Sequence, residues 1–319
     1  MSQPLHVVLG ASGAAGREVV KALKERNEEV RAASRSKEFE DIETVPADLR
    51  YLAQAEESVS GADYVYLCAG LPYDTKVWEK EWPLIMNNVI TACEKTEARL
   101  IFLDNIYMYG PPPLRLPFSE EHPQKPSSRK GKVRKKIADA LMLAHRTGRV
   151  RAVIGRSADF YGPGVEKSIL YISFLERMLK NKNPQFIGKD PKLSRTFAYT
   201  PDIGRALRTL ALDEDTYGKV WHLPVSEPVT MVNAAAEFNR VLGTDRKVKT
   251  IPRKMFSAAG AFSSDLREVK EMLYQYDHPY IMSTAQFHAR FPDFQAVTFR
   301  EGAREMAHSF MEEKAITAK

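Results

Sequence analysis

The sequence predicts an α/β protein built on a doubly wound parallel sheet, followed by a smaller C-terminal lobe. Three observations lead to this prediction. Short apolar runs alternate with segments of helical periodicity from Leu5 to Arg156, as expected for a parallel sheet with helices on both faces. A glycine-rich turn follows the first apolar run, and the regular alternation weakens past Arg156.

Length and composition exclude several classes of protein. A chain of 319 residues suggests one large domain or two closely joined ones. No apolar run approaches the roughly 20 residues of a membrane helix, so we expect neither a signal peptide nor a span, and a cytoplasmic location. Cys68 and Cys93 stand outside any Cys-x-x-Cys or histidine cluster, which indicates reduced thiols and no metal site.

The first strand, turn and helix form the most informative stretch. A strand over 5–9 leads into a turn at 10–16 and then a helix over 17–23, the context in which glycines indicate dinucleotide binding by a Rossmann-type fold. The glycines would allow the tight turn, the approach of a pyrophosphate, and close packing of helix on strand. A purely structural turn is the alternative. The expected cofactor contacts here are Gly10, Ser12, Gly13, Ala14, Ala15 and Gly16.

The end of the second strand favours NADP(H) over NAD(H), although NAD(H) is also compatible. This strand, over 29–33, ends at Ser34 and Arg35, where an NAD-specific fold usually places an acid for the adenosine ribose. A guanidinium instead binds a 2′-phosphate through charge-assisted hydrogen bonds. The alternative is that Arg35 is an ordinary surface arginine. Asp48 follows a short third strand and is a further expected contact of the cofactor.

The remaining elements complete two domains. A strand within 63–70 ends at Ala69 and Gly70, which we expect beside the cofactor. We expect a cofactor domain over 1–156 and a mainly helical substrate lobe over 157–319, some segments of which could return to the sheet. The other expected elements are helices over 76–94, 131–145, 169–180 and 201–212, strands over 100–103, 150–154, 195–199 and 220–223, a loop over 111–128 and a turn over 159–164.

Three further segments carry a resemblance to a known family. Residues 104–110 match the pattern Ser-Ser-x-x-Val-Tyr-Gly, 159–164 match Asn-Val-Tyr-Gly-Pro-Gly, and 195–202 match Arg-x-Phe-x-Tyr-Val-x-Asp. Together with the glycines and Asp48, they resemble the extended branch of the short-chain dehydrogenase/reductase superfamily, the NAD(P)-dependent epimerase/dehydratase-like proteins. The joint match is far more specific than any single segment.

The catalytic positions depart from that family. Its enzymes use a Ser or Thr, then Tyr-x-x-x-Lys on a helix with an acid four residues after the lysine. The resemblance places Asn105 at the serine, and Asp139 as the acid makes Lys135 the lysine and Gly131 the tyrosine position. A shift by one residue supplies no tyrosine either. The chain therefore resembles atypical members that lack the full tetrad.

The resemblance still implies candidate site residues. Asn105 would polarise the substrate, Tyr107 would donate the proton as the best substitute acid, and Lys135 would hold the nicotinamide ribose. Tyr161 and Arg195 would bind substrate, Arg195 at the position of the family's diphosphate arginine. For both tyrosines, packing at a strand end is the alternative.

A basic run over 129–136 contains six cationic residues in eight positions. Cations at a helix N-terminus oppose the helix dipole, so the run suggests an anionic ligand, either cofactor phosphates or substrate. A solvated helix end is the alternative. Nucleic acid is a weaker interpretation, because the run lacks interleaved aromatic residues and the net charge is only +6.

Three functions follow from these observations. The first is an NAD(P)-dependent oxidoreductase or epimerase-like enzyme acting on a small anionic or sugar-like substrate. The second is a nucleotide-sugar epimerase with tightly bound NAD, and the third is a non-catalytic NADP(H)-sensing regulator. The resemblance implies a homodimer through the two long helices on one sheet face, and no membrane partner is expected.

Overall fold

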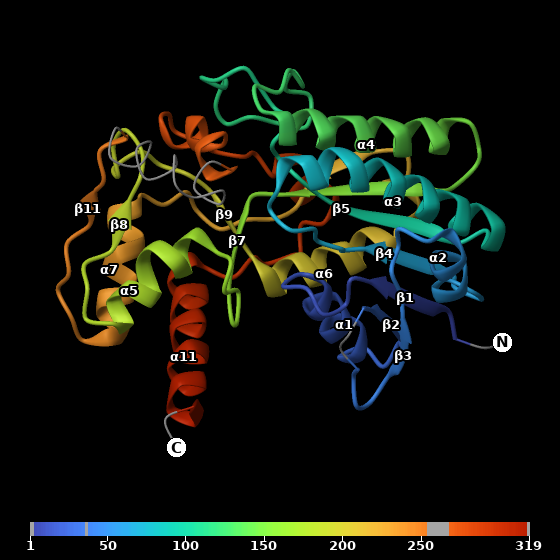
Figure 1. The fold of residues 1–319 in the computed structure, drawn as a ribbon, viewed down its shortest axis with the longest axis horizontal. Coiled ribbons are helices and arrows are strands. Elements are labelled where there is room, and N and C mark those ends of the chain that lie inside the picture. The colour runs from blue at the N-terminus through green and yellow to red at the C-terminus, as the bar shows by residue number, and fades with distance from the viewer. Residues whose placement is uncertain (1–2, 36–37, 254–267, 318–319) are drawn as a thin grey trace. The chain divides into compact units, whose positions relative to one another are not determined.

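A seven-stranded parallel sheet, built from strands between Leu5 and His222, is the centre of the fold of this part of the chain (Figure 1). In this computed structural model, which describes all residues except 1–2, 36–37, 254–267 and 318–319, the strand order is β10-β6-β5-β4-β1-β2-β3. Because the order runs outward from β1 in both directions, the predicted doubly wound sheet is confirmed. Its strands are β1 (Leu5–Leu9), β2 (Glu29–Ser34), β3 (Glu43–Pro46), β4 (Tyr64–Leu67), β5 (Arg99–Asn105), β6 (Ala152–Ser157) and β10 (Val220–His222).

Helices cover both faces of this sheet. In Figure 1, α3 and α4 lie along one face, and α1 and α6 along the other. Val89 of α3 and Leu141 of α4 share an apolar core with Phe102 of β5. On the other face, a Cβ at Gly204 of α6 would lie 2.3 Å from the carbonyl oxygen of Glu18, so only glycine allows this approach to α1. The helices are α1 (Gly16–Lys24), α2 (Leu52–Ser58), α3 (Thr75–Thr96), α4 (Arg129–Arg146) and α6 (Thr200–Ala211).

The two long helices begin at side-chain caps. The Asp74 carboxylate accepts a hydrogen bond from the Val77 N–H at 2.9 Å, and α3 then runs through Pro83. The Ser128 hydroxyl accepts from the Gly131 N–H at 3.0 Å, so α4 begins two residues before the expected Gly131. Each cap satisfies a backbone donor that the helix itself leaves unpaired.

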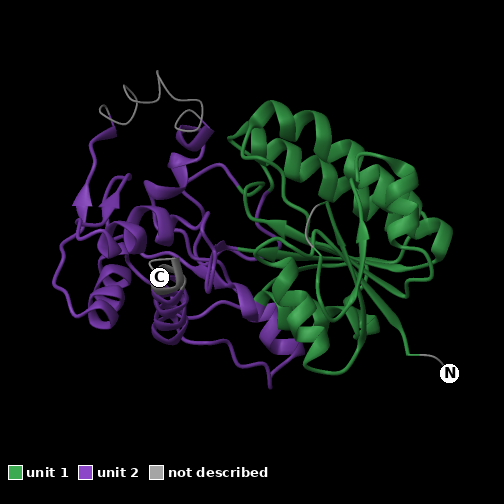
Figure 2. Cartoon of the chain, turned by 60° about the horizontal axis from the view of Figure 1, so that its bottom comes forward, with its two compact units in different colours: residues 1–109, 124–157, 203–223 green, residues 110–123, 158–202, 224–319 purple. Residues whose placement is uncertain are grey.

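The chain divides into two units, coloured separately in Figure 2. The first comprises residues 1–109, 124–157 and 203–223, and the second 110–123, 158–202 and 224–319. The expected boundary at residue 156 lies beside the change of unit after Ser157, and the expectation allowed later segments to return to the sheet. Residues 203–223 return to the first unit, where they add β10 to the sheet beside β6, and residues 110–123 belong to the second.

The second unit has its own apolar core, in which Phe174, Phe238 and Phe299 are buried. Part of the turn expected over 159–164 is a strand, because β7 pairs in parallel with β9. The elements of this unit are β7 (Asp159–Tyr161), a π-helical turn (Tyr171–Leu175), α5 (Glu176–Leu179), β8 (Gln185–Phe186), β9 (Phe197–Tyr199), α7 (Met231–Leu242), β11 (Lys249–Thr250), a 3₁₀ turn (Leu273–Tyr276), α10 (Ala285–Arg290) and α11 (Phe299–Thr317).

The described residues include neither a helix that could span a membrane nor a cluster that could hold a metal ion. None of their helices is both long and apolar enough to cross a membrane. They also contain no group of three or more His, Cys, Asp or Glu side chains that could hold a metal ion. Cys68 and Cys93 are buried free thiols, and burial raises the pKa of Cys68 to about 12.

Candidate functional site

The glycine turn between β1 and α1 is built so closely that side chains cannot replace its glycines. Gly10 has a φ of +81°, a left-handed conformation that favours glycine. A Cβ at Gly10 would lie 2.5 Å from the Cα of Ala69, and one at Gly16 would lie 2.2 Å from the carbonyl oxygen of Gly10. Ala69, two residues after β4, therefore forms a wall of the turn.

The start of α1 presents unpaired backbone donors. Within the described residues, the N–H groups of Ser12, Ala14 and Ala15 donate to no other backbone group, and Ala15 has no side-chain cap. Such N–H groups, together with the helix dipole, make the N-terminus of a helix suitable for a phosphate. In sequence the turn follows β1, and in space it lies beside the end of the neighbouring strand β4. The strand order reverses at this point, which is where open α/β sheets bind ligands. The residues present thus fit a dinucleotide phosphate.

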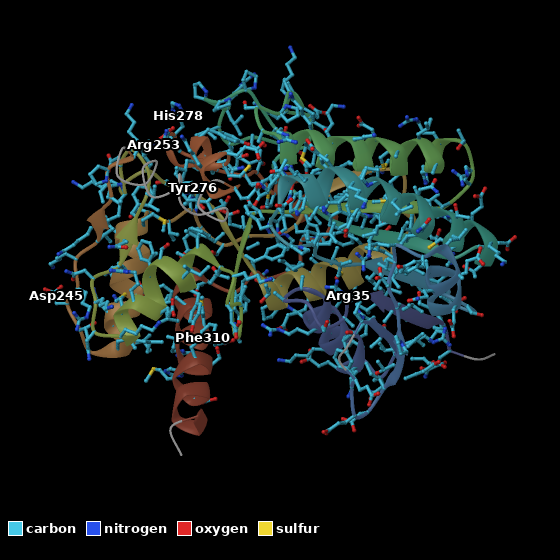
Figure 3. The ribbon with its side chains drawn as sticks, in the orientation of Figure 1. Arg35, Asp245, Arg253, Tyr276, His278 and Phe310 are labelled. Carbon is cyan, nitrogen blue, oxygen red and sulfur yellow. The ribbon has the colours of Figure 1, made fainter. Side chains whose placement is uncertain are left out.

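Ser34, the last residue of β2, and Arg35 lie at the edge of the sheet that carries the glycine turn. Ser34 is buried, and its hydroxyl donates to the Ser12 hydroxyl at 3.1 Å, which joins the end of β2 to the glycine turn. Arg35 is exposed and is labelled in Figure 3. Asp48 forms two hydrogen bonds with the Nε of Arg50, at 2.9 and 3.0 Å. This contact lowers the pKa of Asp48, with a smaller contribution from the charge of Arg35.

Asn105 and Tyr107 are brought together at the end of β5. The Asn105 side-chain oxygen accepts from the Tyr107 N–H at 3.1 Å, a local turn that fixes both residues. The half-buried Tyr107 ring stacks on Trp78 with 6.4 Å between ring centroids. α4 approaches the same turn, because a Cβ at Gly131 would lie 2.4 Å from the Tyr107 carbonyl oxygen.

The structure places Lys130 and Arg134, rather than Lys135, on the inner face of α4. Lys130 is 0% exposed; its Nζ donates to the Thr75 hydroxyl at 2.9 Å and lies 4.4 Å from the centroid of the Tyr73 ring. Arg134 is also buried. One turn of helix separates these two cations, so they share a face.

Lys135 lies on the solvent side of the same helix, and its expected place beside Asn105 and Tyr107 needs correction. Its side chain is 37% exposed and pairs with Asp139 at 2.5 Å. The reason is the helical period of about 100° per residue. The apolar residues Val133, Ile137 and Leu141 set the buried face, and Lys135 falls outside it.

A buried polar cluster supports this inner face. Asp104 accepts from the Nε of Arg134 at 2.7 Å and from the Nε of Arg156 at 3.2 Å. Arg156 also donates to the Tyr109 hydroxyl at 2.9 Å, and this hydroxyl oxygen lies 2.7 Å from Nε2 of His222. Burial opposes the charge of Arg156, but Tyr109 and Asp104 outweigh it and raise its pKa.

Sequence reasoning missed these buried cations. The apolar spacing of Val133, Ile137 and Leu141 was the available signal, since Lys130 and Arg134 stand three residues before Val133 and Ile137 and therefore share their helical face. Counting back from Asp139 instead selected Lys135, one residue past the buried Arg134. Arg156 was missed because we expected its strand to end at Ile154.

Tyr161 and Arg195 belong to the second unit, where both are buried. Tyr161 is 0% exposed in the aromatic core beside Phe299, and burial raises the pKa of its hydroxyl. This burial fits the alternative of packing at a strand end better than the expected contact with substrate. Arg195 lies 3.8 Å from the centroid of the Tyr276 ring (labelled in Figure 3) and donates to the Gln275 carbonyl at 3.1 Å. Its guanidinium thus contacts neighbours within the unit.

Comparisons with known proteins agree with this fold. The model of the "NAD dependent epimerase/dehydratase family" matches residues 6–222. No curated protein matches the chain. Among solved structures, the chain is similar to a UDP-glucose 4-epimerase from Thermus thermophilus in complex with NAD, with a TM-score of 0.76 and 18% identity over 96% of this chain and 99% of the other.

Two further structures are similar to the same extent. One is an epimerase from Methanothermobacter thermautotrophicus, with a TM-score of 0.82 and 16% identity over 99% of this chain and 94% of the other. The second is a UDP-N-acetylglucosamine 4-epimerase from Methanobrevibacter ruminantium M1 in complex with UDP-N-acetylmuramic acid. Its TM-score is 0.79 and its identity 19%, over 98% of this chain and 100% of the other. At these identities the likeness is one of fold.

Proposed function

Since this chain belongs to the NAD dependent epimerase/dehydratase family, we propose that it is an NADP(H)-preferring oxidoreductase that acts on a small anionic or sugar-like substrate. The observation that carries the proposal is the glycine turn, whose unpaired N–H groups and closely packed glycines suit a dinucleotide phosphate. When bound, the cofactor would supply or accept a hydride. The cytoplasm as the compartment and a homodimer as the assembly belong to the same proposal.

Arg35 would set the preference for NADP(H). Its exposed guanidinium follows β2, where a carboxylate would repel a 2′-phosphate. Replacing Arg35 with Asp should lower the ratio of NADPH to NADH affinity by more than about tenfold, as a charge reversal beside a phosphate requires. Arg26→Asp, the same change at another exposed arginine of this unit, should leave the ratio unchanged. An unchanged ratio in the Arg35 variant would remove the basis for the NADP(H) preference.

Asn105, Tyr107 and Lys130 would act at the reacting end of the site. Asn105 would polarise the substrate, Tyr107 would donate or accept the proton, and Lys130 would take the ribose-holding role first assigned to Lys135. Lys130 suits this role because it lies on the inner face of α4. The Tyr107→Phe variant should lose about a hundredfold in turnover while keeping its cofactor affinity. Full turnover in that variant would show that Tyr107 is not the acid.

A nucleotide-sugar epimerase is the second candidate. The family match favours it, and the similar structures include UDP-sugar 4-epimerases. Such an enzyme reoxidises its cofactor in each cycle and therefore keeps it bound. The position of Arg195 favours it less than the sequence suggests, because that guanidinium packs on Tyr276.

Released cofactor distinguishes the candidates. The purified full chain is denatured, and the supernatant is assayed for nicotinamide dinucleotide and its redox state. Stoichiometric NAD(H) would support the epimerase and contradict the role of Arg35. Little bound cofactor, with NADPH binding when it is added and turnover in a carbonyl screen, would support the oxidoreductase. Binding of NADPH without turnover would favour a sensor, and no binding would refute all three.

A further inference from the structure

A hollow with a volume of about 490 Å³ lies on the surface of the first unit, on the outer side of α4. We call it the lysine pocket. It is formed by the loop that leads into α4 and by the first three turns of that helix. Its lining residues are Lys125, Pro126, Lys132, Lys135, Lys136 and Asp139.

The lysine pocket carries an excess of positive charge. Its one carboxylate, Asp139, already pairs with Lys135 at 2.5 Å. Lys125, Lys132 and Lys136 form no ion pair with any described residue, although Arg129 on the same helix pairs with Glu79. The N-terminal half of α4 adds the positive end of its dipole. These like charges repel one another, and a bound anion would relieve the repulsion.

We propose that the lysine pocket binds a small anion that carries two or more phosphate or carboxylate groups. Its volume falls in the range of roughly 300–1,000 Å³ that is usual for small-ligand sites. Lysine ammonium groups act as rotatable point charges and suit such groups without fixing one geometry. A polyvalent anion is favoured over a monovalent one because three lysines need neutralising. The lining contains no aromatic side chain on which a base could stack, which disfavours nucleic acid.

This site is separate from the proposed cofactor residues. Lys130 and Arg134 point from α4 into the unit, where they contact Thr75 and Asp104. Lys132 and Lys136 are exposed on the opposite side of the helix. The proposal therefore stands whether or not the protein uses a nicotinamide cofactor.

Titration of tripolyphosphate into the full chain at about 0.1 M ionic strength, where the Debye length is about 10 Å, tests the proposal by calorimetry. We expect saturable 1:1 binding that the double variant Lys132→Gln/Lys136→Gln weakens by more than tenfold, since each charge contact in water is worth about a factor of five. Inorganic phosphate should bind at least about tenfold more weakly, as it can meet fewer of these charges.

The control removes the same charge elsewhere. Lys76 and Lys80 are exposed on α3, so Lys76→Gln/Lys80→Gln should weaken binding by no more than about twofold through the screened long-range field. Absence of saturable binding would overturn the proposal. Equal weakening in both double variants would also overturn it, because it would indicate only the net charge. So would full affinity in the pocket variant, because the probe would then bind elsewhere, such as at the glycine turn.

Discussion

Asp104 pairs with two buried guanidinium groups, and its replacement by alanine tests whether that cluster stabilises the first unit. Its carboxylate and the Arg134 and Arg156 side chains are 5% exposed or less. Asp104→Ala leaves both cations buried without a counter-charge, and breaking one buried pair in this way costs about 3–5 kcal/mol. Arg134 keeps its hydrogen bond to the Leu103 carbonyl, and Arg156 keeps the one to Tyr109. We therefore expect Asp104→Ala to lower the free energy of unfolding by about 3–5 kcal/mol in total, rather than by that amount for each arginine.

Urea unfolding followed by tryptophan fluorescence measures this loss. Trp82 is a suitable reporter because the Arg134 guanidinium lies 4.6 Å from the centroid of its ring. With an m-value of roughly 3 kcal/mol/M, the urea concentration at the unfolding midpoint should fall by roughly 1 to 1.7 M. Asp139→Ala removes a carboxylate from an exposed pair on the same helix and should cost only about 0.5 kcal/mol.

A second variant separates the buried charges from a general loss of packing. Adding Arg134→Met to Asp104→Ala removes one uncompensated cation, so the double variant should be more stable than Asp104→Ala alone. A loss of less than about 1 kcal/mol in Asp104→Ala would refute the reasoning. A double variant less stable than the single one would show that Arg134 contributes through its packing on the rings rather than through its charge.

Two more predictions follow from the glycine turn and from a buried histidine. Gly16→Ala places a methyl group 2.2 Å from the Gly10 carbonyl oxygen, so a titration with NADPH should show an affinity reduced more than about tenfold. The control is Gly61→Ala, where the added methyl group lies in open space at a φ of +72°. This variant should lower stability slightly and leave the NADPH affinity unchanged. His6 lies 3.1 Å from the Tyr66 hydroxyl, and burial lowers its pKa. Just below pH ~6.5, the unfolded chain therefore binds more protons at His6 than the folded chain does. The folded state keeps its full stability above that pH and loses stability as the pH falls toward the folded pKa of His6, by at most about 1.4 kcal/mol per pH unit. His6→Gln should flatten urea midpoints measured between pH 5 and 7, and an unchanged slope would exclude His6 as the cause.

The sheet was predictable because its strands are buried on both faces. Continuous apolar runs such as Leu100–Leu103 and Ala152–Ile154 have one plausible structure when they alternate with amphipathic helices. Strand ends were less predictable. β5 continues through Asp104 and Asn105, and β6 through Arg156. Polar residues in these strand ends depend on partners that are distant in sequence, and local patterns do not encode such partners.

The glycine turn was predictable from sequence because glycine is required there by local geometry. The second unit was not predictable in the same detail. Its aromatic core buries Tyr161, although a Tyr-Gly-Pro-Gly sequence is locally typical of an exposed turn. Arg195 likewise packs on Tyr276, about 80 residues later in the chain, and only the tertiary fold brings this pair together.

The basic run of α4 shows how one sequence feature can serve two environments. Successive residues of a helix lie about 100° apart, so eight consecutive positions cannot all face the same side. Lys130 and Arg134 point inward, while Lys132, Lys135 and Lys136 line the outer pocket. The two groups should therefore separate on mutation. Changes to the inner pair should alter cofactor affinity and stability, whereas loss of the outer lysines should alter only the binding of polyvalent anions. A single-function explanation of the run does not predict that separation.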